Sequence, residues 1–133
     1  MKNKLSKSIF LGFILSFVFA FTADVAGITD DIALTIRTGN SKDLAKYFNT
    51  NLDLTIPGYT GSCSKSQAEI IIKDFFKKYP PKTFTIIHQG ASTDGAQYSI
   101  GSMNSGSMNF RVYFLLKKFS EKFFIQQLRF EQE

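Results

Sequence analysis

The second half of the chain contains four strand-like runs separated by short turns, and this pattern constrains the fold more than any other feature of the sequence. Apolar residues, many of them β-branched or aromatic, alternate along the runs in the way expected of strands. Asp94-Gly95, between the first two runs, is a strong hairpin signal. Strands joined by so few residues pair with their chain neighbours, so we expect an antiparallel meander. The four runs are residues 83–89, 96–103, 107–118 and 122–130.

Three amphipathic segments in the first half of the chain predict helices. In the first segment, apolar side chains recur at spacings of three and four residues, which places them on one face of a helix. The third segment is the clearest, because Ser64 and Gln67 form a capping-box pattern and Pro80-Pro81 ends the helix. The three predicted helices are residues 24–40, 41–48 and 64–79.

One further strand is expected between the second and third helices. Within residues 51–57, leucine and isoleucine alternate with polar residues, which is typical of a half-buried strand, and residues 58–63 are expected to form a loop. The element order is then ααβαββββ. This order predicts an α+β fold in which helices cover one face of a curved antiparallel sheet. Residues 24–133 contain no linker or repeat, so we expect a single domain.

Both sides of the last two predicted strands are apolar. One side would face the helices, and it contains Phe110, Val112, Phe114, Leu116, Phe124, Leu128 and Phe130. The solvent side of such a sheet is normally polar, so an apolar second face indicates a partner surface, and we expect a homodimer through it. Scattered exposed apolar residues are the alternative. The arginines on these strands would bind an anion or a partner carboxylate, with solvated or salt-bridged side chains as the alternative. The expected partner face is Ile87, Arg111, Tyr113, Leu115, Phe123, Ile125 and Arg129.

The N-terminus has the three-part pattern of a secretory signal peptide. Residues 1–8 contain three lysines and no acid, and residues 9–21 are an apolar run too short to span a bilayer comfortably. We expect cleavage after Ala20, which removes residues 1–20; an end as late as residue 23, or an uncleaved anchor, is the alternative. The remaining domain would be exported to the periplasm, the cell envelope or the outside of the cell, with no stable membrane span.

Cleavage also changes the argument from charge. The full chain has a formal net charge of +5, but Lys2, Lys4 and Lys7 belong to the predicted leader. The mature domain would carry a net charge of about +2, which is too small to indicate nucleic acid as a partner. Two groups of lysines remain, and they would either bind an envelope polyanion or form ordinary solvated surfaces. They are Lys73, Lys77, Lys78 and Lys82, and Lys117, Lys118 and Lys122.

The single cysteine and the single histidine limit the chemistry. Cys63 has no partner within the chain, so we expect a buried, unreactive thiol, with an intermolecular disulfide as the alternative. One histidine and one cysteine are too few for the common metal centres, and none of the usual nucleotide, metalloprotease or nucleophile motifs occurs. We therefore expect no metal and no cofactor.

A pocket between the helices and the sheet is the expected site for a small apolar ligand. Under strict alternation His88 shares a side with Phe84 and Ile86, so it would point toward the helices, where it is the best candidate for a general base. A hydrogen-bonded core histidine is the alternative. Asp53 falls on the opposite side of its strand from the leucines and would face solvent. The expected ligand-binding residues, for which core packing is the alternative, are Tyr47, Phe75, Tyr79, His88 and Tyr98.

The element order and several sequence segments resemble known proteins. The order resembles the nuclear transport factor 2-like superfamily, a cone-shaped, cystatin-like α+β fold. More closely, the chain resembles an exported family of Bacteroidota, domain of unknown function 4783, over about residues 27–131. The segments that carry this resemblance are ITDDIALTIRTGNSKDLAKYFN, LDLTIPG, SKSQAEIIIKDFF, PPKTFTIIHQG, FRVYFLLKK and IQQLR.

The resemblance implies a fold but no activity. The superfamily includes isomerase-, cyclase- and dehydratase-like enzymes as well as proteins that only bind ligands or other proteins, and fold alone does not decide between them. The predicted strands carry almost no carboxylate that would pair with a general base. We therefore expect a non-enzymatic module that binds a small apolar ligand or an envelope protein. The alternative is an enzyme of the same fold that uses His88.

Overall fold

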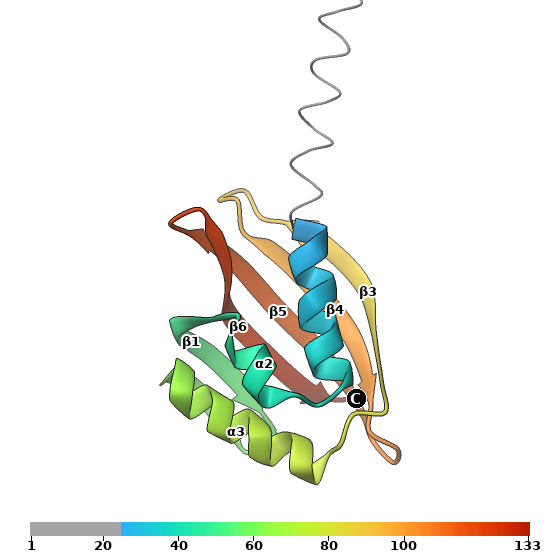
Figure 1. The fold of residues 1–133 in the computed structure, drawn as a ribbon. Helices are drawn as coiled ribbons and strands as arrows, with labels where there is room; N and C mark the ends of the chain where they lie inside the picture. Colours follow the sequence, from blue (N-terminus) through green and yellow to red (C-terminus); the bar gives the residue numbers. More distant parts are fainter. Residues whose placement is uncertain (1–24) are drawn as a thin grey trace, which may run out of the picture.

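The structure is a computed structural model that describes residues 25–133 (Figure 1). The predicted signal peptide lies outside the described residues. The first helix occupies residues 25–37. The remaining elements are α2 (Ser41–Ala45), β1 (Phe48–Ile56), β2 (Tyr59–Ser64), α3 (Lys65–Lys78), β3 (Thr83–Ala91), β4 (Gln97–Asn104), β5 (Asn109–Phe119) and β6 (Lys122–Gln132).

The six strands form one sheet in the order β2-β1-β6-β5-β4-β3. Neighbouring strands are antiparallel except for β1 and β6, which are parallel. The predicted meander of β3 to β6 is confirmed, as is the α+β class. The sheet is mixed rather than purely antiparallel, because the chain reaches β1 from the helices and the last strand returns beside it in the same direction.

The first half of the chain differs from the predicted pattern in two places. Residues 58–63 were expected to form a loop, but most of them belong to β2, because Pro57-Gly58 closes a tight turn and the chain pairs back onto β1. The second helix is shorter than expected. It ends at Ala45, and the buried Phe48 begins β1 instead of completing the helix. The element order is therefore ααββαββββ.

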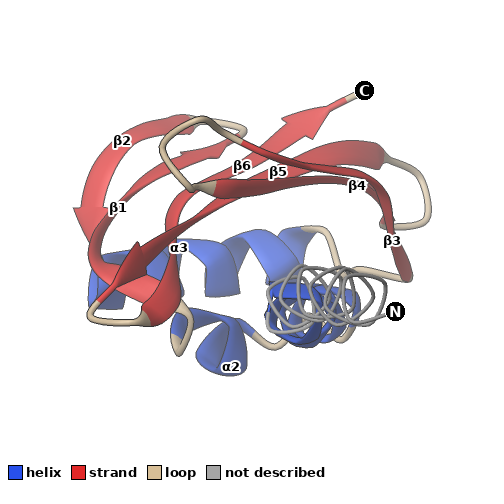
Figure 2. Cartoon of the chain, turned by 90° about the horizontal axis from the view of Figure 1, so that it is seen from above, coloured by secondary structure: helices blue, strands red, loops and turns tan. Residues whose placement is uncertain are grey.

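All helices of the described chain lie against one face of the sheet (Figure 2). The capping box that starts α3 is present, since the Ser64 hydroxyl accepts from the Gln67 N–H and the Gln67 side chain accepts from the Ser64 N–H. The first helix is tied to the far strand by Arg37, whose guanidinium donates to the Phe84 carbonyl. No helix of the described chain is long and apolar enough to cross a membrane.

The core fills the space between the helices and the sheet. The predicted inward residues of β5 are all buried: Phe110, Val112, Phe114 and Leu116. On β6 the alternation is broken by a bulge at Gln126, which has no partner on β5. This extra residue turns Ile125 into the core, where it is fully buried, and leaves Phe124 outside it. The prediction that places Ile125 on the partner surface was therefore wrong, and Phe124, which was expected on the helix side with Leu128 and Phe130, does not belong to the core cluster.

Candidate functional site

The face of the sheet opposite the helices is uncovered within the described chain (Figure 2). Side chains on this face form an ordered row. Four residues from four adjacent strands make up this row: His88 of β3, Tyr98 of β4, Tyr113 of β5 and Arg129 of β6. We call them the stacked row. Cross-strand partners share a face, and the register of β3 to β6 puts all four on the side away from the core.

The members of the stacked row contact one another in sequence. His88 Nε2 lies 3.1 Å from the Tyr98 hydroxyl oxygen. The rings of Tyr98 and Tyr113 stack at a centroid distance of 6.3 Å and an angle of 23°. The Arg129 guanidinium carbon lies 4.5 Å from the centre of the Tyr113 ring. A guanidinium over a tyrosine face and offset-stacked rings are both attractive arrangements, so the row is held in place before any partner binds.

A bulge in β3 places His88 in this row. Ile86 pairs with Gly101 and His88 with Ile100, so Ile87 is an extra residue on β3. The extra residue reverses the alternation after Ile86, and His88 therefore points away from the helices. Its side chain is exposed and lines none of the cavities described below. The expectation that His88 faces a pocket under the helices was wrong for this reason.

Gly90 provides the space that Tyr98 occupies. These residues are cross-strand partners, and a Cβ atom at Gly90 would lie 2.5 Å from the Tyr98 ring and hydroxyl. Only glycine allows the ring to lie flat across β3 at this point. Sequence analysis missed Gly90, although a glycine inside a strand pattern is a recognised signal of close approach.

Arg129 ends the row next to an acidic residue. Its Nη1 atom lies 3.8 Å from the Glu131 carboxylate, and the Arg129 side chain is 39% exposed. Its Nε atom is buried without a hydrogen-bond partner in the described chain. A buried guanidinium N–H without an acceptor is unfavourable. The exposed part of the guanidinium can still donate to an added carbonyl or carboxylate.

The rest of the uncovered face mixes apolar and charged side chains. Ile100 and Leu115 lie half-buried beside the two tyrosines. Arg111 pairs across the strands with Glu131, and Asp53 of β1 lies opposite Gln127 with an exposed side chain, as predicted. Basic and acidic groups thus occur together on one surface with an apolar centre.

Part of the predicted partner face is therefore found on the uncovered face, and part is not. Arg111, Tyr113, Leu115 and Arg129 lie there. Ile87 is exposed at the bulge. Phe123 packs against the edge of the core, and Ile125 is inside the core.

The predicted ligand-binding residues do not lie in one cavity. Phe75 and Tyr79 pack against each other and against Phe110, and they line a shallow hollow between α3 and the turn after β1. Tyr47 lines a different hollow, and His88 and Tyr98 belong to the stacked row.

The hollow at Tyr47 is a groove of about 530 Å³. We call it the hairpin groove, because the turn between β5 and β6 forms one wall and the start of the first helix and the end of α2 form the other. Its apolar lining is Ile28, Tyr47, Phe123 and Phe124, and its charged lining is Lys46, Lys118, Glu121 and Lys122. The groove combines an aromatic floor with an excess of positive charge.

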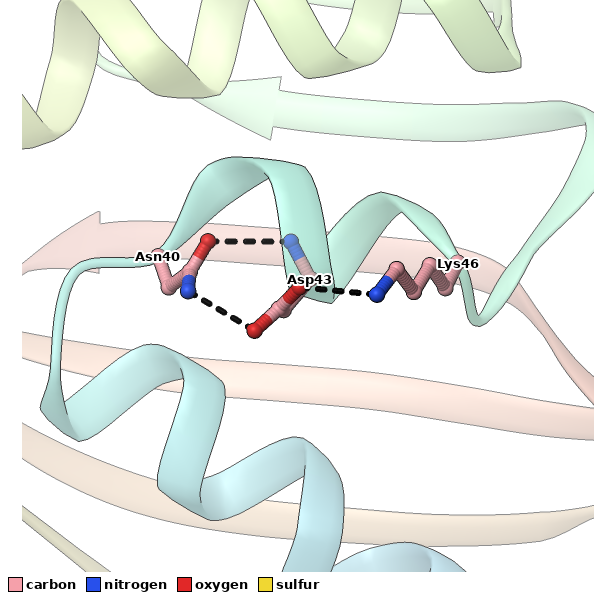
Figure 3. Close-up of polar contacts among 3 residues, drawn as sticks. All are labelled: Asn40, Asp43 and Lys46. Atoms are coloured by element: carbon pink, nitrogen blue, oxygen red, sulfur yellow. Dashed lines mark hydrogen bonds and ion pairs between the residues drawn. The ribbon is translucent and has the colours of Figure 1, made fainter.

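The short helix α2 is fixed by a polar network that also positions one lysine of the groove (Figure 3). The Asn40 side chain accepts from the Asp43 N–H at 3.0 Å and donates to the Asp43 carboxylate at 2.8 Å. The same carboxylate lies 3.0 Å from the Lys46 ammonium. This helix-capping arrangement holds the turn that leads to Tyr47.

The cysteine is buried, as predicted. Cys63 lies on β2 opposite Leu52 and is part of the core cluster. Burial raises the pKa of the Cys63 thiol, an effect that the nearby Asp53 carboxylate adds to and the Tyr59 hydroxyl partly offsets. The pKa of Tyr59 is also raised, chiefly by loss of solvent and then by the neighbouring thiol. A thiol that stays protonated in this way is a poor nucleophile.

The described residues contain no group of three or more histidine, cysteine, aspartate or glutamate side chains suited to a metal ion.

Comparison with known proteins agrees with this architecture. Residues 29–131 match the family described as Domain of unknown function (DUF4783). A DUF4783 family protein from Bacteroides uniformis is 29% identical, with 78% of this chain and 95% of that chain covered at a TM-score of 0.73. A second, from Bacteroides ovatus, is 28% identical, with 77% and 93% covered at a TM-score of 0.72.

A more distant structure has the same fold. An NTF-2 like protein of unknown function from Silicibacter pomeroyi is 11% identical, with 87% of this chain and 98% of that chain covered at a TM-score of 0.60. At this identity the likeness concerns the fold alone, and it confirms the predicted nuclear transport factor 2-like architecture. No curated protein matches the chain.

Proposed function

Because the chain belongs to the DUF4783 family, which is defined by sequence rather than by an activity, we propose from the geometry that it is a non-enzymatic binding module whose uncovered sheet face binds a second copy of the same chain. The predicted signal peptide supports an exported location for this module, in the cell envelope or beyond it. The observation that carries the proposal is the stacked row.

The stacked row has the composition of a protein-binding surface. Tyrosine and arginine are the residues that most often dominate the binding energy of interfaces, and here they are fixed by contacts within the row. Fixed side chains lose little conformational entropy when a partner binds. The half-buried Ile100 and Leu115 add an apolar centre.

The charges of the uncovered face favour a second copy of the chain over a partner whose surface carries charges of only one sign. Arg111 and Arg129 occur on the same surface as Asp53 and Glu131, so the face carries both members of a charge pair. A two-fold axis places a surface patch against itself, and such a patch complements itself when it contains both signs. The exposed part of the Arg129 guanidinium would donate to a carboxylate of the other copy.

The enzyme alternative loses its main support. A general base works best in a desolvated pocket beside the reacting group. His88 is exposed on an open sheet, its hydrogen-bond partner is Tyr98, and it lines none of the described cavities.

Sedimentation velocity tests the proposal. The protein is expressed from the full sequence, and intact mass spectrometry of the purified protein defines its N-terminus, which also tests cleavage after Ala20. We expect a concentration-dependent dimer. Tyr113→Ser together with Arg129→Ser should weaken the dimer by about 30-fold or more, because truncation of a central interface residue costs about 2 kcal/mol.

A matched control distinguishes loss of the uncovered face from a general loss of exposed apolar surface. Ile70 of α3 is 61% exposed on a helix, and Ile70→Ser removes exposed apolar area away from the stacked row. This variant should dimerise like the parent. A parent protein that stays monomeric at all accessible concentrations, or an Ile70→Ser variant that loses the dimer equally, would contradict the proposal.

A further inference from the structure

The hairpin groove is a second candidate site, separate from the stacked row. It involves the helix side of the sheet and the tip of the β5–β6 hairpin, and it shares no residue with the stacked row. Its volume of about 530 Å³ lies within the range of small-molecule sites. The groove is therefore large enough for a small molecule, and its lining residues indicate the chemistry of that ligand.

The apolar part of the groove comes from two directions. Ile28 and Tyr47 contribute from the helical layer, and Phe123 and Phe124 from the first residues of β6. Ile28, Tyr47 and Phe123 also pack against the edge of the core, so this part of the lining is anchored to the folded domain. A lining of this kind accommodates an alkyl or aryl chain.

The charged part lies around this floor and is predominantly basic. Lys46 is paired with Asp43, whereas Lys118 and Lys122 form no ion pair within the described chain. The Lys118 ammonium lies 5.8 Å from the centre of the Phe123 ring, so a positive charge stands directly beside the aromatic floor. Glu121 is the one acidic residue of the lining.

A second hollow continues the same surface past the hairpin. It is lined by Lys117, Lys118, Phe119 and Phe123 together with the turn of residues 94–96, and it shares Lys118 and Phe123 with the hairpin groove. Lys118 thus lines two neighbouring hollows, and the hairpin groove is the one with more apolar side chains in its lining. A head group near Lys118 would leave the attached chain free to lie over the phenylalanines.

We propose that the hairpin groove binds a single-chain amphiphile with an anionic head group, the chain lying on Ile28, Tyr47, Phe123 and Phe124 and the head group lying between Lys118 and Lys122. The feature that carries this assignment is the combination of an aromatic floor with two unpaired ammonium groups in one groove. Such an amphiphile occurs either as a free carboxylate or within a membrane, and the test distinguishes these sources.

Titration with decanoate, below the concentration at which it forms micelles, tests the groove directly. Decanoate should shift the NMR amide signals of Ile28, Phe123 and Phe124 in a saturable manner. Butyrate, which has the head group without the long chain, and decyltrimethylammonium, which has the chain with the opposite charge, should each bind at least about tenfold more weakly.

Charge reversal provides the matched variants. Lys118→Glu with Lys122→Glu should weaken decanoate binding by about tenfold, whereas Lys73→Glu with Lys77→Glu should leave it unchanged. Both pairs consist of exposed lysines and change the net charge equally, but Lys73 and Lys77 line a separate hollow near α2 and α3. Thermal unfolding checks that both variants are folded.

Three results would overturn the proposal. The first is equal loss of binding in both lysine pairs, which would indicate net charge alone. The second is saturable decanoate binding whose amide shifts map to the uncovered sheet face. The third is no binding of free decanoate together with cosedimentation on phosphatidylglycerol vesicles, which would indicate a membrane surface instead of a single amphiphile. None of these results depends on whether the protein dimerises.

Discussion

On each face of the sheet, an aromatic ring packs over a glycine of the neighbouring strand, but the two rings have different roles. On the covered face the ring of Phe84 lies across Gly101, where an added Cβ would be 2.5 Å from the ring. On the uncovered face the ring of Tyr98 lies across Gly90 with the same 2.5 Å approach. Both pairs join β3 to β4, yet Phe84 is buried whereas Tyr98 is only half-buried. The Tyr98 hydroxyl also forms a hydrogen bond with His88.

The comparison shows how an aromatic ring over a glycine can serve either the core or the surface. The buried ring contributes apolar area to folding. The half-exposed ring contributes less to folding but is fixed in a position from which it can meet a partner. If this distinction is correct, matched substitutions on the two faces should affect different measurements.

The largest contrast is expected from truncating the two rings. Phe84→Ala should reduce the free energy of unfolding by about 3–5 kcal/mol, because it removes a buried phenylalanine and leaves a cavity. Tyr98→Ala should reduce it by about 1 kcal/mol and should mainly weaken self-association. Urea unfolding followed by circular dichroism measures the first quantity, and sedimentation velocity the second. Equal destabilisation by the two variants would remove the distinction between the faces.

The glycines provide the second contrast. Gly101→Ala should cost about 2–3 kcal/mol, because the new methyl group meets the buried Phe84 ring at 2.5 Å and the Thr85 carbonyl at 2.9 Å. At Gly90 the three nearest atoms belong to the half-exposed Tyr98 side chain, which can swing outward. Gly90→Ala should therefore cost about 1 kcal/mol or less, while displacing Tyr98 from the stacked row.

The displaced ring gives Gly90→Ala a signature of its own. Tyr98 would lose its contacts with His88 and Tyr113, so the ring signals of both residues should shift in NMR spectra of the variant. Self-association should weaken although the fold is retained. A variant with unchanged ring signals and an unchanged dimer would show that Gly90 is not required for the row.

The next largest effect is expected from removing the N-cap of α2. Asn40→Ala removes the side chain that accepts from the Asp43 N–H and contacts its carboxylate, as drawn in Figure 3. Loss of such a cap typically costs about 1 kcal/mol. Because α2 lies on the covered face, self-association through the uncovered face should be unaffected. Asn40→Asp keeps the acceptor for the Asp43 N–H, loses the donor to the carboxylate and should retain part of the stability.

The same comparison explains which features the sequence could predict. The strands of the meander, the capping box of α3 and the burial of Phe110, Val112 and Phe114 follow from local rules of periodicity and capping, and the structure confirms them. The stacked row does not follow from such rules. Its residues lie on four strands, and the register that aligns them depends on pairings made across the whole sheet.

Two bulges account for the main errors of the sequence analysis. Each inserts one unpaired residue, Ile87 in β3 and Gln126 in β6, and each reverses the side to which the following residues point. Strict alternation therefore placed His88 and Ile125 on the wrong faces. Nothing in the local sequence at these positions distinguishes a bulged strand from a regular one, because the bulge depends on how the partner strand is aligned.

The smallest expected effect concerns pH and the covered face. Burial raises the pKa of Cys63, and the pKa of Tyr59 beside it is raised as well. In the unfolded chain the thiol ionises near its ordinary pKa of 9.0. Between that value and the higher pKa of the folded protein, the unfolded state has released a proton that the folded state retains. The stability due to the neutral thiol is therefore complete below about pH 9 and decreases as the pH rises above it.

Thermal unfolding at pH 8 and pH 10 measures this decrease. The difference in unfolding temperature between the two pH values should be smaller in Cys63→Ala than in the parent protein, because the variant lacks the buried thiol that resists ionisation. Tyr113→Phe, which removes a tyrosine hydroxyl from the uncovered face, should leave the difference as it is in the parent. If Cys63→Ala and the parent lose equal stability between pH 8 and pH 10, the thiol on the covered face does not contribute, and the titration of other groups accounts for the whole alkaline response.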